Sequence, residues 1–251
     1  MRRLGLIGHP LTHSFSPRYF EEKWFREGVH GYRYDLFDVE EFPASLADWW
    51  QDQEGLIGVN VTIPYKIEVL KEIEKSRQSE HVRVIGAANT LVMDPTDGEL
   101  RAENTDWRGF LDVLDQEQVL ATGRPALILG NGGAARAIRY ALERIGVDFG
   151  VVHRAAGPDT IEYSALKRQM ESYGLIVNTT PLGTYPNDDQ YPPIPYDEID
   201  EEHYYFDLVY RPENTVAMKM CALGGAFVQN GYGMLAAQAE YAWEFWREYY
   251  R

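Results

Sequence analysis

A glycine-rich segment in the middle of the chain is the first feature that could carry chemistry. Its sequence is Gly130-Asn131-Gly132-Gly133-Ala134-Ala135, between a short apolar run and a stretch with helical spacing. In a strand–turn–helix arrangement the first glycine makes a tight turn, the second lets the backbone approach a phosphate, and the small third residue permits close packing. A Gly-x-Gly-x-x-Ala pattern alone is also found in ordinary turns. The strand before it and the helix after it favour a dinucleotide site.

The segment after the next predicted strand indicates which dinucleotide would bind. NAD sites usually place a carboxylate there to accept a hydrogen bond from the ribose 2′-hydroxyl. This chain instead has His153-Arg154-Ala155. A guanidinium makes bidentate contacts with phosphate, so Arg154 favours NADP, although an ordinary exposed loop arginine is the alternative.

Two serines near the N-terminus could bind an acidic ligand. Ser14 and Ser16 lie between a predicted strand and a predicted helix, where two hydroxyls could donate to a carboxylate with help from the helix dipole. Ser16 is also an expected N-cap, with Pro17 in the first helical position. On the serines alone, capping is the favoured interpretation.

Lys66 and Asp106 are candidates for acid–base chemistry. We predict that Pro64 opens a helix and places Lys66 in its first turn, where the macrodipole disfavours a cation and so hints at a functional role. Asp106, in Asn104-Thr105-Asp106, is a plausible partner. A Lys–Asp pair in a cleft can move a proton to or from a substrate hydroxyl. On spacing alone, an ordinary surface lysine is the more common case.

The overall composition limits the classes of partner. The chain has 251 residues and a formal net charge of −15, which argues against nucleic acid or anionic membranes but leaves room for a local basic pocket. The single cysteine, Cys221, excludes a disulfide within the chain and a cysteine-based structural zinc site, and we predict no metal site. No apolar stretch has the length of a signal sequence or a membrane span, so we expect a cytoplasmic protein. We also expect a monomer or a homodimer.

Strand-like and helix-like segments alternate along the chain, which predicts an α/β protein with a largely parallel sheet. The boundary between two such cycles lies near residues 104–123. The final helix is expected to fold back onto the first cycle. We predict strands at 4–9, 32–39, 55–62, 89–93, 99–104, 126–129, 149–153, 175–178, 204–209 and 226–229, and helices at 16–28, 42–51, 64–73, 134–145 and 232–250.

Eight short motifs in a fixed order resemble those of the shikimate dehydrogenase family, and the resemblance extends from residue 4 to about residue 246. The motifs are His13-Ser14-x-Ser16-Pro17, Asn60-Val61-Thr62-x-Pro64-x-Lys66, Gly86-Ala87-x-Asn89-Thr90, Asn104-Thr105-Asp106-x-x-Gly109, Gly130-x-Gly132-Gly133-Ala134-Ala135, Asn178-x-Thr180-Pro181-Leu182-Gly183, Asp207-x-x-Tyr210-x-Pro212-x-x-Thr215 and Gly231-x-Gly233-Met234-Leu235-x-x-Gln238.

This resemblance implies a fold, a reaction and a set of site residues. Residues 1–104, completed by helix 232–251, would form a substrate-binding catalytic domain, and residues 105–231 a Rossmann-like NADP domain. The reaction would be the reversible reduction of 3-dehydroshikimate to shikimate, a step toward the aromatic amino acids.

Lys66 and Asp106 would be the catalytic pair. Substrate-binding residues would be Ser14, Ser16 and Tyr210 for the carboxylate, and Thr62, Asn89, Asp106 and Gln238 for the ring or its hydroxyls. Cofactor-binding residues would be Gly130, Asn131, Gly132, Gly133, Ala134, His153, Arg154, Leu208 and Gly231.

Two other functions remain open at this stage. Family members commonly have Asn-Arg-Thr or Asn-Arg-Ser where this chain has His153-Arg154-Ala155, and an acid, Asp159, follows closely. An NAD-dependent quinate/shikimate dehydrogenase is therefore one alternative. A non-catalytic NADP-binding sensor is the other, although a sensor has no need of the Lys66–Asp106 pair.

Overall fold

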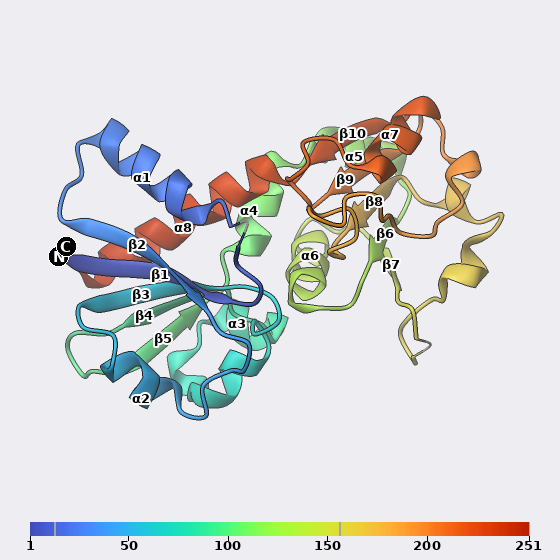
Figure 1. Cartoon of the computed structure of the whole chain (residues 1–251). Coiled ribbons are helices and arrows are strands. Elements are labelled where there is room, and N and C mark those ends of the chain that lie inside the picture. Colours follow the sequence, from blue (N-terminus) through green and yellow to red (C-terminus); the bar gives the residue numbers. More distant parts are fainter. Residues whose placement is uncertain (13, 156, 251) are drawn as a thin grey trace. The chain divides into compact units, whose positions relative to one another are not determined.

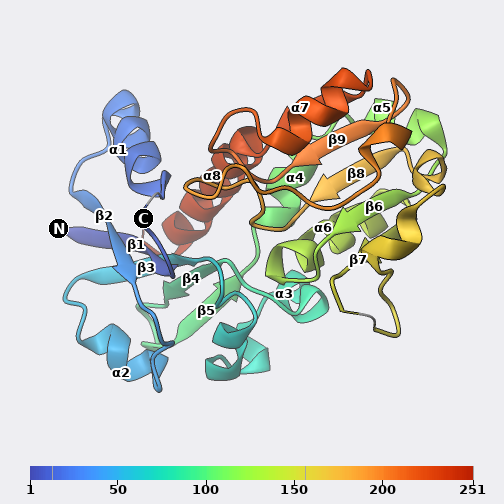
Figure 2. The same cartoon turned by 45° about the vertical axis from the view of Figure 1, so that its right-hand side comes forward.

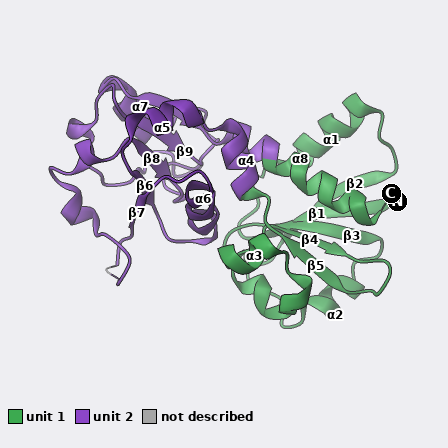
Figure 3. Ribbon diagram, turned by 180° about the vertical axis from the view of Figure 1, so that it is seen from behind, with its two compact units in different colours: residues 1–106, 238–251 green, residues 107–237 purple. Residues whose placement is uncertain are grey.

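The computed structural model describes residues 1–12, 14–155 and 157–250. The chain divides into two compact units, coloured separately in Figure 3: unit 1 comprises Met1–Asp106 and Gln238–Arg251, and unit 2 comprises Trp107–Ala237. The sequence prediction placed these divisions at 104/105 and 231/232. In the structure the second division falls inside helix α8 (Tyr232–Tyr249).

Unit 1 contains a five-stranded sheet in the order β2-β1-β3-β4-β5. Its strands are β1 (Arg2–Gly8), β2 (Tyr32–Asp38), β3 (Leu56–Val61), β4 (Thr90–Met93) and β5 (Leu100–Glu103). The first three are parallel, β4 runs antiparallel to β3, and β5 runs antiparallel to β4. The ends of β1, β3 and β5 and the start of β4 therefore lie at one edge of the sheet.

Helices cover both faces of this sheet (Figures 1 and 2). On one face, α1 (Ser16–Glu27) and the C-terminal part of α8 pack through Phe20, Trp243 and Trp246. On the other face lie α2 (Leu46–Gln51) and the 3-10 helix η1 (Glu68–Glu72). A Cβ atom on Gly58 would lie 2.4 Å from the Trp246 indole nitrogen, so this glycine is what lets α8 pack directly on β3. The short helices η2 (Lys75–Arg77) and α3 (Glu80–Ile85) connect to the β4–β5 hairpin.

Unit 2 contains a fully parallel sheet in the order β10-β9-β8-β6-β7. The strands are β6 (Ala126–Leu129), β7 (Phe149–Val152), β8 (Leu175–Asn178), β9 (Tyr204–Asp207) and β10 (Phe227–Asn230). The chain runs outward from β6 to β7 and then returns to β8 on the other side of β6. Ligands of open α/β sheets bind beyond the carboxyl ends of the strands at such a switch point.

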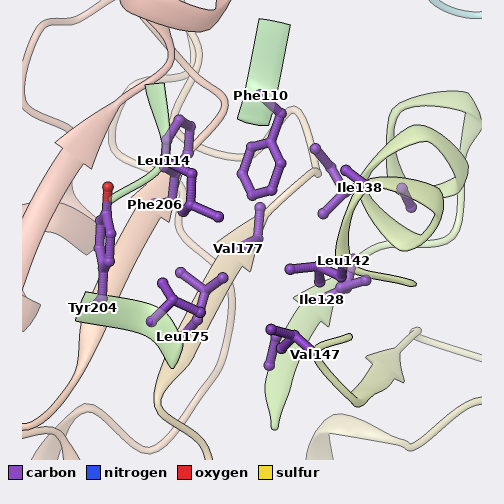
Figure 4. Packing of buried hydrophobic residues seen from close by; sticks show 14 of the residues in the cluster. Phe110, Leu114, Ile128, Ile138, Leu142, Val147, Leu175, Val177, Tyr204 and Phe206 are labelled. Atoms are coloured by element: carbon purple, nitrogen blue, oxygen red, sulfur yellow. The ribbon is translucent and has the colours of Figure 1, made fainter. Parts of the chain in front are cut away.

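The core of unit 2 lies on both faces of this sheet. Helices α4 (Asp106–Val113), α5 (Gln116–Thr122) and α6 (Gly133–Arg144) cover one face; Figure 4 shows Phe110 and Ile138 directed toward Ile128 and Val177 of the strands. On the other face lie α7 (Val216–Leu223) and the 3-10 helices η3 (Tyr163–Leu166), η4 (Met170–Ser172) and η5 (Tyr196–Glu198). The predicted α/β fold with a Rossmann-like second part is confirmed.

Three local predictions differ from the structure. Ser16 is not an N-cap: α1 begins at Ser16 itself, and the residue before it, Phe15, makes no capping side-chain bond. The predicted helix at 64–73 is a turn followed by η1, because the Lys66 carbonyl accepts from the amide of Ala88, 2.8 Å away, instead of continuing a helix. The predicted helix at 42–51 begins only at Leu46, where Ser45 caps it.

Candidate functional site

Lys66 and Asp106 form a close, largely buried ion pair in unit 1. The Lys66 Nζ atom lies 2.6 Å from Asp106 Oδ2, and the two side chains are 14% and 6% exposed. Lys66 sits in the turn after β3, and Asp106 follows β5. No helix starts at Pro64, so Lys66 does not lie in a first helical turn as predicted. The predicted pairing with Asp106 is nevertheless present, and Lys66 is not an ordinary surface lysine.

Asn89 holds the carboxylate of this pair. Its amide nitrogen lies 2.9 Å from Asp106 Oδ1, 2.9 Å from Thr105 Oγ1 and 3.2 Å from Gln238 Oε1. Its amide oxygen accepts from the backbone N–H of Thr105 at 2.7 Å. Because Asn89 occupies Oδ1 and Lys66 occupies Oδ2, the Asp106 carboxylate is fixed on both sides. Gln238, from α8, belongs to the same cluster.

A second group of buried polar residues supports Asn89, and the sequence prediction gave these residues no role in the site. The Tyr34 hydroxyl donates to Asn60 Oδ1 at 2.8 Å, and Asn60 Nδ2 donates to the Asn89 carbonyl at 3.2 Å and to Thr90 Oγ1 at 3.1 Å. Burial raises the pKa of Tyr34, so its hydroxyl stays protonated and remains a donor. The signal available in the sequence was an amide, Asn60, inside an otherwise apolar buried strand.

Ser14, Ser16 and Thr62 follow the carboxyl ends of β1 and β3, which are neighbours in the sheet. The Ser16 amide donates to Ser14 Oγ at 3.3 Å, and both serines are partly exposed. Asp38 anchors the loop before them: its carboxylate accepts from the Leu11 amide at 3.0 Å and lies 2.7 Å from His9 Nδ1. These hydrogen bonds lower the pKa of Asp38. Hydroxyls and a lysine thus converge on one edge of the sheet; His13 lies outside the described residues.

In unit 2, the glycine segment forms the turn between β6 and α6. Gly130 has a φ of 107°, which side-chain-bearing residues rarely adopt, and Gly132 is the N-cap of α6. Among the described residues, and apart from Gly132 and its two chain neighbours, no atom lies within 4 Å of the place where a Cβ would stand on Gly132, and no side chain caps the first amides of the helix. The turn therefore presents open space and free backbone donors, and the residues present fit a dinucleotide diphosphate.

The residues after β7 border a cavity of about 260 Å³. Its lining comprises Asn131, Arg139, His153, Ala155, Gly157, Pro158, Asp159 and Thr160. Arg154 is exposed and is not among the described residues that line it. The sequence prediction named His153 and Asn131 but missed Arg139.

Leu208 and Gly231 come together at the carboxyl ends of β9 and β10. The Gly231 amide donates to the Val209 carbonyl at 3.1 Å, and a Cβ on Gly231 would lie 2.1 Å from the Leu208 carbonyl oxygen. Only glycine fits there. Tyr210 lies just beyond, in unit 2, whereas Ser14 and Ser16 belong to unit 1.

A fully buried carboxylate, Asp207, orders the segment that carries Leu208 and Tyr210. It accepts from Asn178 Nδ2 at 2.9 Å, from the Val209 amide at 3.1 Å and from Thr215 Oγ1 at 2.7 Å. Burial raises the pKa of Asp207 to about 6. The end of β8, the end of β9 and the N-cap of α7 are therefore tied to one side chain.

The described part of the chain holds neither a membrane-spanning helix nor a candidate metal cluster. None of its helices combines the length and apolar character needed to cross a membrane. In the same residues, no group of three or more His, Cys, Asp or Glu side chains could hold a metal ion.

A parallel sheet with a glycine turn at its switch point, together with a buried lysine–carboxylate pair, defines a dinucleotide-dependent oxidoreductase. Residues 6–91 match the family model for the shikimate dehydrogenase substrate binding domain. A shikimate dehydrogenase (NADP(+)) from Methanopyrus kandleri is 34% identical over 97% of this chain and 89% of its own length.

The chain is also similar to solved structures over nearly its whole length. Shikimate 5-dehydrogenase from Thermus thermophilus, in complex with NADP(H) and shikimate, is 31% identical with a TM-score of 0.79, covering 99% of this chain and 94% of its own. Quinate dehydrogenase from Corynebacterium glutamicum, in complex with NAD, is 25% identical with a TM-score of 0.81, covering 98% and 94%. The chain belongs to the shikimate dehydrogenase family, as its motifs predicted.

Proposed function

We propose that this protein catalyses the reversible, NADP-dependent reduction of 3-dehydroshikimate to shikimate. The observation that carries this proposal is the Lys66–Asp106 pair, 2.6 Å apart and held by Asn89. A binding module without catalysis would have no use for a buried lysine beside an oriented carboxylate.

The chemistry divides between cofactor and protein. NADP, when bound, supplies or accepts the hydride at the reacting carbon. Lys66 Nζ donates a proton to the carbonyl oxygen during reduction and removes it from the hydroxyl during oxidation. Asp106 keeps the ammonium group in place, and Asn89 keeps Asp106 in place.

The remaining predicted residues bind the two ligands. Ser14, Ser16 and Tyr210 would donate to the substrate carboxylate, and Thr62, Asn89 and Gln238 would hydrogen-bond its ring hydroxyls. A protein with a net charge of −15 needs such oriented local donors to bind an anion. The cofactor residues would be Gly130, Asn131, Gly132, Gly133, Ala134, His153, Arg154, Leu208 and Gly231. Unit 1 would thus supply most of the substrate-binding residues, and unit 2 would supply Tyr210 and the cofactor-binding residues.

We also propose a cytoplasmic location and a monomeric or homodimeric state. A single buried cysteine, Cys221, agrees with a reducing compartment, where disulfides are rare.

The test is a comparison of substrates with the purified protein. Shikimate with NADP should give rapid formation of reduced cofactor, whereas quinate with NAD should react slowly. The second candidate, a quinate/shikimate dehydrogenase using NAD, is supported by Asp159 beside the cavity and by the Corynebacterium relative. Faster turnover with quinate and NAD would establish that candidate instead. NADP binding without any turnover would establish a sensor.

A further inference from the structure

The cavity beside the glycine turn contains a permanent cation that the family motifs do not include. Asn131 follows β6 and His153 follows β7, and these strands are adjacent and parallel. Both residues therefore lie at the carboxyl edge of the sheet, next to the diphosphate-binding turn. In dinucleotide-binding folds this is where the adenosine ribose lies.

Arg139 reaches this cavity from helix α6. Its guanidinium carbon lies 5.7 Å from the centre of the Phe149 ring, at the start of β7. Within residues 1–12, 14–155 and 157–250, Arg139 makes no ion pair, and it is only partly exposed. A guanidinium held over an aromatic ring still has N–H donors available for a phosphate, and it loses little side-chain freedom on binding.

We propose that Arg139 binds the 2′-phosphate of NADP and is the principal residue that selects NADP over NAD. This inference rests on the proposed function, since it assumes that NADP is the cofactor. Asn131 and His153 complete the site, and Arg154, exposed and outside the cavity, contributes less. Asp159 is the one carboxylate among the described lining residues, and its negative charge would weaken phosphate binding there.

The site is tested by calorimetric titration of the full-length protein with 2′,5′-ADP and with 5′-ADP, at one fixed salt concentration. Arg139→Met should weaken 2′,5′-ADP binding by ~10- to 100-fold, as expected for the loss of a charge-assisted bidentate contact, and should leave 5′-ADP binding nearly unchanged. Arg154→Met should have a smaller effect. Arg144→Met is the matched control, because Arg144 lies on the same helix over the Trp107 ring. Thermal unfolding of each variant shows whether it is folded.

Loss of 2′-phosphate selectivity in Arg154→Met but not in Arg139→Met would overturn the inference. Equal weakening of both nucleotides by Arg139→Met would also overturn it, since that result indicates general damage to the cleft. These titrations are done without shikimate, so they test the nucleotide site separately from catalysis. A wild type that prefers 2′,5′-ADP yet fails to oxidise shikimate would contradict the proposed function while leaving the role of Arg139 intact.

Discussion

Replacing Lys66 with methionine removes the proposed proton carrier and keeps most of the side-chain volume. Asp106 keeps its hydrogen bond from Asn89 at 2.9 Å, and the methionine stem fills most of the space of the lysine stem. General acid–base catalysis typically contributes ~10²- to 10⁴-fold, so kcat for shikimate oxidation should fall by that factor. At about 1.36 kcal/mol per tenfold change, this is a loss of roughly 2.7–5.5 kcal/mol of transition-state stabilisation. The KM for shikimate should change less, since other residues hold the substrate.

The same substitution has a second, separable effect on stability. Asp106 is buried and would lose Lys66, its one cationic partner among the described residues. A buried group left partly unpaired costs about 1–3 kcal/mol, which urea unfolding measures independently of turnover. Steady-state rates with shikimate and NADP give kcat and KM for the variant. Lys71→Met, five residues further along and 74% exposed, is the matched control and should behave as wild type. Near-normal kcat in a folded Lys66→Met variant would refute the assignment of Lys66 as proton carrier.

Three further predictions concern binding, packing and pH. Ser16→Ala should weaken shikimate binding by about 1–3 kcal/mol and should weaken binding of the carboxamide analogue less; equal losses would mean that the serine does not read the carboxylate. Gly231→Ala places a Cβ 2.1 Å from the Leu208 carbonyl oxygen, so urea unfolding should show a loss of about 1–3 kcal/mol together with weaker NADP binding. Asp207 has a pKa raised by burial to about 6, so the folded state binds more protons than the unfolded state at pH values between about 4 and 6. The free energy of unfolding of wild type, measured against Asp207→Asn, should therefore fall by about 3 kcal/mol as the pH rises through that window, and a constant difference would contradict the raised pKa.

Most strands could be predicted from the sequence because each is a short apolar run bounded by turn residues. β6 and β8 follow local rules of this kind, and Gly98, in the loop 94–99 between β4 and β5, has a positive φ of 72° that favours glycine. The failures arose where a long-range contact overrides a local preference. The 64–73 segment has a proline at its start and a helical composition, yet the hydrogen bond from Ala88 to Lys66 holds it in a turn.

The candidate site was partly predictable for a related reason. Motif resemblance named Lys66, Asp106, Asn89 and Gln238 individually, but only the sheet register brings residues so far apart in the chain to one edge. Asn60 appears in one of the motifs but was given no role, because a buried amide is informative only when its partners are known, and these lie on β2 and β4. Polar residues that act on other polar residues leave no spacing signal along the chain.

Arg139 shows the same limit from the side of the cofactor. A sequence rule places the cation for a 2′-phosphate directly after the second strand of the nucleotide-binding unit, because that position is fixed by β-strand geometry. A helix offers another route, since α6 runs beside β7 and a long side chain from it reaches the same cavity. Helical residues face the cavity or the solvent according to a 3.6-residue period. The packing of Ile138 and Leu142 on the sheet sets the rotation of the helix, and this rotation decides which arginine side chain reaches the cavity. The polarity of a loop residue can thus be read from the sequence, whereas the direction of a helical arginine depends on the core beneath it.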